Sequence, residues 1–214
     1  VRFYLIYFIS ISFLLCNTEP FLIYKSGKDI YANKIDEKVI IDGVLDERFW
    51  KESNAIIDFV QQEPDYFSNP SEKTEVKIAY DRNTIYVAAL LYDSDPFLIK
   101  EQLASRDDWK QGFEGNADWF SVEIDSEHDH QTGYSFSVNA SGVQCDDMIY
   151  DDSFYDNSYN AVWESKVLLT DDGWILEMAI PFSMLKFGKS NEYNWGVNFT
   201  RYIYRKDETI KWLL

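Results

Sequence analysis

Two tryptophans stand where an indole ring has little reason to be buried. Trp109 lies in Arg106–Gly112, a polar run without the alternation that would place its side chain in a core. Trp212 lies near the end of the sequence, beside Lys211. An exposed indole is a rigid apolar surface, and sugars present C–H faces that stack on such a ring. Trp109 and Trp212 are therefore candidate carbohydrate-binding residues.

The other tryptophans that we weighed have apolar surroundings. Trp163, Trp174 and Trp195 are in register with apolar neighbours on alternating segments, and Trp50 lies in a predicted helical turn over 47–51. A large aromatic ring in such a pattern usually packs in the core. We therefore predict structural roles for these four indoles.

An acidic cluster could supply oxygen ligands to a cation. It consists of Asp146, Asp147, Asp151, Asp152 and Asp156, within a segment that reads as a long surface loop from residue 145 to 160. Carboxylates on a flexible loop suit calcium, although the spacing of an EF-hand is absent. The candidate calcium ligands are Asp146, Asp147, Asp151 and Asp152, and a solvated acidic loop is the alternative. Tyr150, Tyr155 and Tyr159 make the same segment a second candidate for sugar stacking.

A second cluster contains both histidines of the chain. His128 and His130 lie among Asp125, Glu127 and Asp129. A His-x-His pair on an extended segment can bind a transition metal. Such a site needs partners that orient the imidazoles, so a solvated hairpin loop is the interpretation we favour.

Catalytic motifs are missing from this sequence. It contains no G-x-S-x-G, no phosphate-binding P-loop and no H-E-x-x-H, and two neighbouring histidines offer no Ser/His/Asp set. A glycosidase needs two carboxylates across a cleft, one of them with a raised pKa. No acid stands in a setting that indicates such a pocket. We expect the chain not to be an enzyme by itself.

Period-two alternation predicts the elements that position these residues. Apolar residues alternate with polar ones in most of the segments, and Ile85–Tyr92 is nearly continuous, as expected for a strand buried on both faces. Asp171–Gly173 predicts a hairpin turn in which the glycine supplies positive φ. The predicted strands are 76–80, 85–92, 120–124, 134–138, 163–169, 174–180, 197–201 and 210–214.

Helical signals are short and few. Asp46 can cap a turn over 47–51, and Pro181 can open another that ends near Leu185. Short strands at hairpin spacing with little helix predict an all-β fold, an antiparallel β-sandwich of the jelly-roll or immunoglobulin type.

The beginning of the sequence has the layout of a secretory signal peptide. Arg2 precedes an apolar run that ends at Cys16, and this run is shorter than the roughly 20 residues that span a membrane. We predict a signal peptide over 1–20, a linker or N-terminal extension over 21–34 and one domain over 35–214. The expected location is exported: periplasmic, outer-membrane-associated or secreted. Cys145 is then a lone thiol, expected to be a small buried hydrophobe.

Composition narrows the possible partners. The 214 residues are 46% hydrophobic and 17% aromatic, too apolar for a disordered chain. The net charge of −17 repels phosphate backbones, so nucleic acid is excluded as an expected partner. Two cysteines build no disulfide framework.

An ordered set of motifs resembles a known family. Ile41–Trp50 reads I-D-G-V-L-D-E-R-F-W, followed by Asp118–Phe120, Gly133–Asn139, Gly173–Trp174 and Trp195–Phe199. Together they resemble family 9 carbohydrate-binding-module-like domains, in particular those at the N-terminus of large exported bacterial proteins. The resemblance implies a β-sandwich that binds a glycan, structural calcium in some members, and a further β-rich region C-terminal to this fragment.

The family's ligand residues carry over only in part. The resemblance implies two tryptophans that sandwich the sugar, an acid and an arginine. Trp212 falls near the later tryptophan, whereas the other positions hold Gly115, Ser121 and Ser137. Trp109 is the candidate replacement, and Arg106 or Asp118 would supply the polar contacts.

These observations predict a non-catalytic carbohydrate-binding domain of an exported bacterial protein, linked to polysaccharide catabolism. Two alternatives stay open. One is a structural sandwich of an outer-membrane-associated protein, and the other is a hydrolase domain that acts on O-glycosyl compounds.

Overall fold

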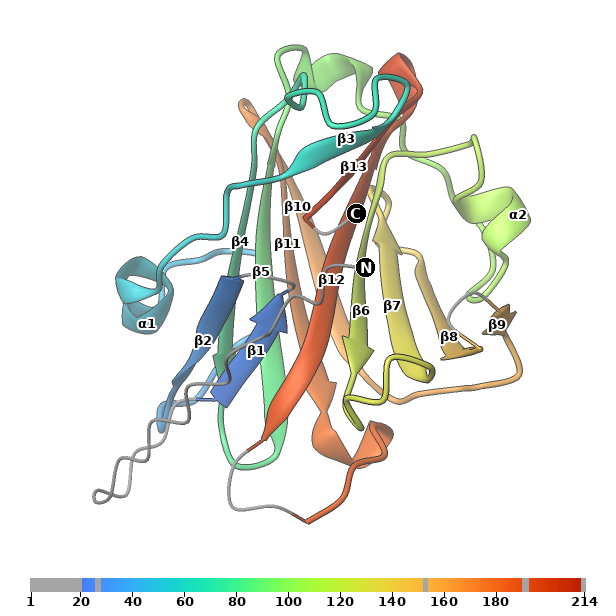
Figure 1. The fold of residues 1–214 in the computed structure, drawn as a ribbon. Helices are drawn as coiled ribbons and strands as arrows, with labels where there is room; N and C mark the ends of the chain where they lie inside the picture. Colours follow the sequence, from blue (N-terminus) through green and yellow to red (C-terminus); the bar gives the residue numbers. More distant parts are fainter. Residues whose placement is uncertain (1–20, 26–27, 152–153, 190–192, 213–214) are drawn as a thin grey trace, which may run out of the picture.

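The protein consists of two β-sheets packed face to face, with short helices at the periphery (Figure 1). The computed structural model describes residues 21–25, 28–151, 154–189 and 193–212; the predicted signal peptide lies outside them. Sheet A contains β3 (Val60–Glu63), β13 (Glu208–Lys211), β12 (Asn194–Ile203), β6 (Trp119–Asp125), β7 (Gly133–Asn139), β8 (Gln144–Tyr150) and β9 (Phe154–Asp156). Sheet B contains β10 (Glu164–Thr170), β11 (Gly173–Pro181), β5 (Thr84–Tyr92), β4 (Thr74–Tyr80) and β2 (Lys28–Lys34), and β1 (Phe21–Lys25) joins the sheets.

The β1–β2 hairpin links the two sheets along one edge. β1 runs parallel to β12, with Leu22 opposite Asn194, and β2 runs parallel to β4, with Asn33 opposite Ala79. The segment 21–34, predicted as a linker or N-terminal extension, therefore forms two strands in its described part. These two parallel pairings occur in a fold whose other described strand pairs are antiparallel.

Alternation determines which side chains fill the space between the sheets. In β6, Phe120, Val122 and Ile124 point into the core and are at most 1% exposed, and the residues between them face outward. Burial of apolar surface stabilises the fold by roughly 25 cal/mol per Å². β5 is buried on both faces, as predicted, because Phe49 and Trp50 pack over its outer side.

Four tryptophans are core residues, as predicted. Trp50, Trp163, Trp174 and Trp195 are between 1% and 5% exposed. The Trp50 Nε1–H donates to Glu177 Oε1 over 3.0 Å. This hydrogen bond holds the helical turn that contains Trp50 against β11.

The hairpin turn between β10 and β11 also agrees with the prediction. Gly173 has φ +141°, and a Cβ there would lie 2.2 Å from the carbonyl oxygen of Leu91. Only glycine fits this close approach to β5.

The helices are short. α1 (Arg48–Glu52) and the 3₁₀ turn η2 (Phe182–Met184) lie where turns were predicted, whereas α2 (Trp109–Gly112) was not predicted. Further 3₁₀ turns are η1 (Pro96–Leu98) and η3 (Tyr204–Lys206). Asp46 is not the cap of α1: Glu47 precedes the helix and makes no side-chain capping hydrogen bond. Among the described residues, no helix is long and apolar enough to cross a membrane.

The segment predicted as a loop over 145–160 is largely a hairpin. β8 pairs with β7 on one side and β9 on the other, with Ile149 opposite Tyr155. Cys145 is 1% exposed, as predicted, and burial raises the pKa of its thiol.

Candidate functional site

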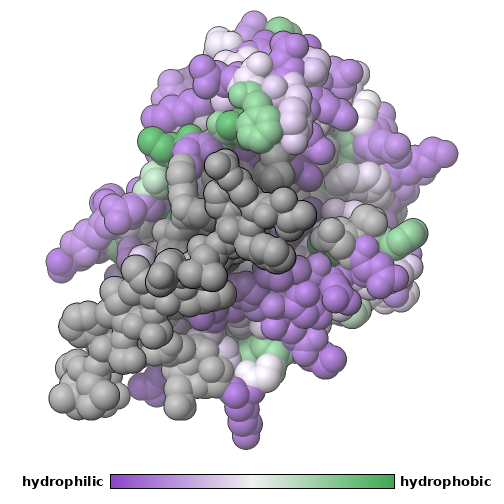
Figure 2. Space-filling view, viewed as in Figure 1, coloured by the Kyte–Doolittle hydropathy of each residue, from purple (hydrophilic) through white to green (hydrophobic). Residues whose placement is uncertain are grey.

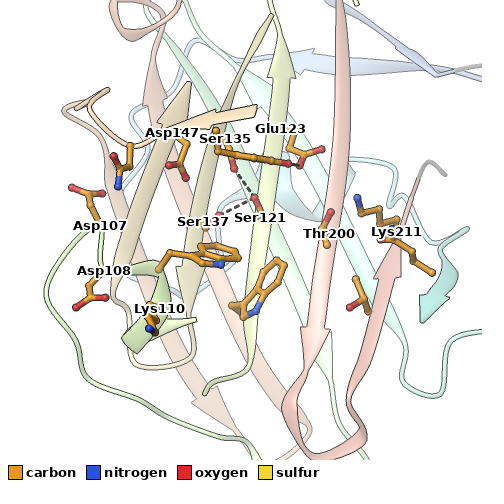
Figure 3. Close-up of a pocket in the computed structure, with 16 residues that line it drawn as sticks. Asp107, Asp108, Lys110, Ser121, Glu123, Ser135, Ser137, Asp147, Thr200 and Lys211 are labelled. Atoms are coloured by element: carbon orange, nitrogen blue, oxygen red, sulfur yellow. Dashed lines mark hydrogen bonds between the residues drawn. The ribbon is translucent and has the colours of Figure 1, made fainter. Parts of the chain in front are cut away.

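A cleft of about 690 Å³ lies on the outer face of sheet A. Its floor comes from β6, β7, β8 and β12, its first wall from the segment 107–110, and its second wall from β3 and β13 (Figure 3). Tyr155 and Asn157, at and after β9, line it as well.

The register of sheet A arranges the floor in rows. Ser121 lies opposite Thr200 on one side and Ser137 on the other. Glu123 lies opposite Ser135, which in turn lies opposite Asp147. Because successive outward residues are about 7 Å apart along a strand, the rows step down the cleft at roughly the width of a sugar ring.

The hydroxyls of the floor form a small network. Ser137 Oγ donates to Ser121 Oγ over 2.9 Å, and Ser121 Oγ lies 3.1 Å from Ser135 Oγ. Figure 3 shows these three side chains together at the centre of the floor. Their small size leaves the space above them open.

Aromatic rings form one end of the cleft. Trp109 stacks on Phe113 with ring centroids 5.0 Å apart and meets Trp119 edge-on at 5.1 Å. Trp119 stacks in turn on Tyr202. Trp109 is 37% exposed and lines the cleft, so an indole surface faces the space above the hydroxyls.

Local hydrogen bonds position Trp109. The Asp108 carboxylate accepts from the backbone N–H of Gln111 and caps α2, while Phe113 is fully buried and anchors the end of this turn. A side-chain cap of this kind satisfies an amide that the short helix leaves unpaired. The polar run that suggested a loop is thus a fixed turn.

Arg106 and Asp118, predicted as polar sugar contacts, serve the fold instead. The Arg106 guanidinium contacts Asp146 and donates to the carbonyl of Ala161 over 2.7 Å. Asp118 is 1% exposed and accepts from the backbone N–H of Lys100 over 2.8 Å. Burial raises the pKa of Asp118 to about 6. Neither side chain lines the cleft.

The prediction that Trp212 is exposed is wrong. It is 2% exposed, packs on Phe199, and its Nε1–H donates to Asp58 Oδ1 over 2.8 Å. The backbone N–H of Trp212 bonds the carbonyl of Phe199, which draws the indole into the core.

The predicted calcium ligands Asp146 and Asp147 do not point to a common site. Asp146 and Asp147 are neighbours on β8, so their side chains point to opposite faces. Asp146 accepts from Trp163 Nε1 over 2.9 Å and from the backbone N–H of Ala161. Asp151 occupies the following turn, and Asp152 lies outside the described residues. Within the described part, no three His, Cys, Asp or Glu side chains are placed to hold a metal.

The histidine cluster is a hydrogen-bonded loop between β6 and β7. Asp125 accepts from the backbone N–H of His130, and Asp129 accepts from the N–H groups of Gln131 and Thr132. The rings of His128 and His130 meet edge to face, 4.8 Å apart.

Of the acidic side chains that line the cleft, Asp147 differs from the others in its hydrogen-bond donors. Asp107 accepts from the backbone N–H of Asp146, and Glu123 Oε1 accepts from the hydroxyl of Tyr155 over 3.0 Å. Asp147 receives only the thiol of Cys145, at 3.7 Å. Burial, together with the negative charges of Asp107, Asp146 and Asp156, raises the pKa of Asp147.

Trp119 and Asp147 line this site but were not predicted as sugar contacts. Trp119 belongs to the outward parity of β6, opposite in direction to Phe120, and this parity was the available signal. Asp147 was assigned to a calcium loop because β8 was not recognised as a strand. Ser121 and Ser137, which align with ligand positions of the resembled family, lie in the floor, whereas Gly115 does not line the cleft.

Comparison with known proteins agrees with this architecture. A family model described as carbohydrate family 9 binding domain-like matches residues 41–211. A carbohydrate binding module family 9 from Caldicellulosiruptor kristjanssonii in complex with cellotriose has TM-score 0.57 and 17% identity, over 84% of this chain and 80% of that chain. One from the same organism in complex with glucose has TM-score 0.57 and 18% identity, over 84% and 85%.

A carbohydrate-binding protein, so described, from Bacteroides uniformis ATCC 8492 has TM-score 0.55 and 13% identity, over 73% of this chain and 77% of that chain. No curated protein matches. At these identities the solved structures show a shared fold. Because the family match spans most of the chain, the protein belongs to the carbohydrate family 9 binding domain-like family.

Proposed function

We propose that this chain is a non-catalytic carbohydrate-binding domain that holds its glycan in the cleft on sheet A. The observation that carries the proposal is the exposed face of Trp109 at the edge of a floor lined with serine hydroxyls. Family membership and the two Caldicellulosiruptor kristjanssonii structures with bound sugar support it.

The two parts of the cleft match the two faces of a sugar. A pyranose presents axial C–H groups that pack on an indole and hydroxyls that exchange hydrogen bonds with polar side chains. Trp109 and Trp119 supply the first surface, and Ser121, Ser135 and Ser137 supply hydroxyls for the second.

The test is calorimetric titration of the chain with cellotriose and glucose. Trp109→Ala should weaken binding about tenfold or more, because aromatic stacking contributes on the order of 1–3 kcal/mol and 1.4 kcal/mol is a factor of ten. Phe97→Ala is the matched control: Phe97 is 94% exposed and lies away from the cleft. Equal affinity of Trp109→Ala and wild type would place the ligand elsewhere.

We also propose that the protein is exported, because Arg2 precedes an apolar run that ends at Cys16. N-terminal sequencing of periplasmic or secreted material should find cleavage before residue 21. The same proposal includes a β-rich region C-terminal to this domain as its partner. The sequence of the full reading frame would test whether such a region is encoded.

Calcium stabilisation stays a prediction. A ligand that binds only the folded state raises stability by RT ln(1+[L]/Kd), about 2.7 kcal/mol at a hundredfold excess over Kd. Equal melting temperatures in chelator and in millimolar calcium would contradict it.

A further inference from the structure

Asp147 is a carboxylate that the fold buries without giving it a strong partner. Its side chain lines the cleft from β8 and is 8% exposed. The only hydrogen bond that it receives within the described part is the weak one from the Cys145 thiol, at 3.7 Å. Lys110 and Lys211 line the same cleft, whereas the charges that act most strongly on Asp147 are the negative ones of Asp107, Asp146 and Asp156.

The other acids of the cleft differ from Asp147 in this respect. Asp107 accepts from a backbone N–H and lies 3.4 Å from the Arg106 guanidinium. Asp108 caps α2 through Gln111, and Glu123 accepts from Tyr155. Each of these three carboxylates therefore holds part of the wall or floor of the cleft in place.

Leaving a carboxylate in this state destabilises the folded protein. Burial removes water from the ionised group, and Asp107, Asp146 and Asp156 repel it. Both effects favour a ligand that brings hydrogen-bond donors, or a positive charge, to this point of the floor.

We propose that Asp147 is the group that recognises the glycan's donors in this cleft, so that the site takes neutral or amino saccharides and rejects uronates. The inference rests on the proposed function. Donors at this point are either sugar hydroxyls or a protonated amine, and both belong to the chemistry that a carboxylate binds.

The register places Asp147 within reach of a sugar stacked on the tryptophans. From Trp119, the outward row of Ser121 and then that of Glu123 follow at about 7 Å each, and Asp147 shares the second row through Ser135. A saccharide of two to three rings that begins at Trp109 therefore spans the floor to Asp147.

The experiment titrates the chain at pH 7 with cellotriose, a fully deacetylated glucosamine trimer and trigalacturonate. Asp147→Asn keeps the size of the side chain and removes its charge. Asp171→Asn is the control, because it removes the same charge at an exposed residue of the β10–β11 turn that does not line the cleft. Melting temperatures of both variants are measured in parallel.

Wild type should bind cellotriose or the glucosamine trimer at least about tenfold more tightly than trigalacturonate. Asp147→Asn should weaken the preferred ligand by about tenfold or more, since a hydrogen bond to a charged group exceeds the 1.4 kcal/mol that a factor of ten requires. Asp171→Asn should stay within about twofold of wild type. The melting temperature of Asp147→Asn should be equal to or above that of wild type, which a purely structural role of Asp147 would not produce.

Two results would overturn the inference and leave the proposed function standing. One is unchanged affinity in Asp147→Asn while Trp109→Ala loses binding, and the other is preference of wild type for trigalacturonate. Binding of none of the three saccharides by wild type would overturn the proposed function together with the inference.

Discussion

Seven tryptophans share one side-chain chemistry, and their surroundings decide what each does. Trp109 faces a cleft, whereas Trp163 is 5% exposed, packs edge-on against Phe136 and donates to the buried carboxylate of Asp146. Sequence alternation predicted both environments. It failed for Trp212, because the contact with Asp58 joins positions that are far apart in the chain.

Truncation of a buried tryptophan should therefore lower stability rather than affinity. We expect Trp163→Ala to lower the free energy of unfolding by about 3–5 kcal/mol through the cavity it leaves. Trp109→Ala should change this free energy by much less, because its ring is partly in water. Urea denaturation of both variants provides the comparison, and equal losses would contradict the assignment of roles.

Asp118 should make stability depend on pH. Its pKa is raised from 3.8 to about 6 by burial, so the folded state holds the proton more tightly than the unfolded state. The stabilisation is fully present below about pH 4 and is lost as the pH rises through 6. Relative to wild type, Asp118→Asn should gain on the order of 2 kcal/mol between pH 4 and pH 7. Denaturation curves at both pH values would show it, and a pH-independent difference would refute it.

At the scale of elements, the sequence predicts strands whose burial alternates. Each of the eight predicted strands has a counterpart among the described strands, and seven of them place apolar side chains in the core. The exception is β10, an edge strand without a buried residue. β8 escaped prediction because Asp146 occupies an inward position, where Arg106 and Trp163 satisfy it. Contacts between residues so far apart in the chain leave no local pattern in the sequence. Because β8 was not predicted, the position of Asp147 in the cleft was not predicted either.

The β1–β2 hairpin was not predicted from the sequence for a related reason. Its strands are defined by partners at 79–80 and 194–196, far away in the chain. Ala32 is 1% exposed, and the Asn33 side-chain amide donates to Ser53 Oγ over 2.8 Å. The hairpin is thus part of the folded domain.

Removal of this hairpin should destabilise the domain. A chain that starts at residue 35 loses the pairings of β2 with β4 and of β1 with β12, and exposes two sheet edges. We expect a clearly lower melting temperature than that of a chain that starts at residue 21, which retains both strands. Equal melting temperatures for the two truncations would show that the segment is dispensable.

At the scale of the whole molecule, charge limits the ligands. The net charge is −17, and hydrophilic side chains cover most of the face drawn in colour in Figure 2. A surface of this sign repels polyanions over a distance of about 10 Å at moderate salt. The acidic side chains that line the cleft extend the negative electrostatic potential into the site, which agrees with a neutral or cationic ligand.

The same surface raises the question of catalysis, since Glu123 and Asp147 face one cleft. They lie on either side of Ser135, two strand spacings or about 10 Å apart at the backbone. Inverting glycosidases place a general acid and a general base across the bond at comparable separations. Here the Tyr155 hydroxyl donates to Glu123 Oε1 over 3.0 Å, so one oxygen of the carboxylate that would act as the base is already engaged.

We therefore expect the purified chain to bind saccharide without cleaving it. Incubation with a panel of neutral polysaccharides and cello-oligosaccharides should release no reducing ends above a blank, at concentrations at which calorimetry shows the site to be occupied. The double variant Glu123→Gln, Asp147→Asn is the control for traces of contaminating hydrolase, because contaminating activity would persist in it. Release by wild type that this variant abolishes would make the domain a hydrolase, and Tyr155→Phe should then increase the rate by freeing Glu123.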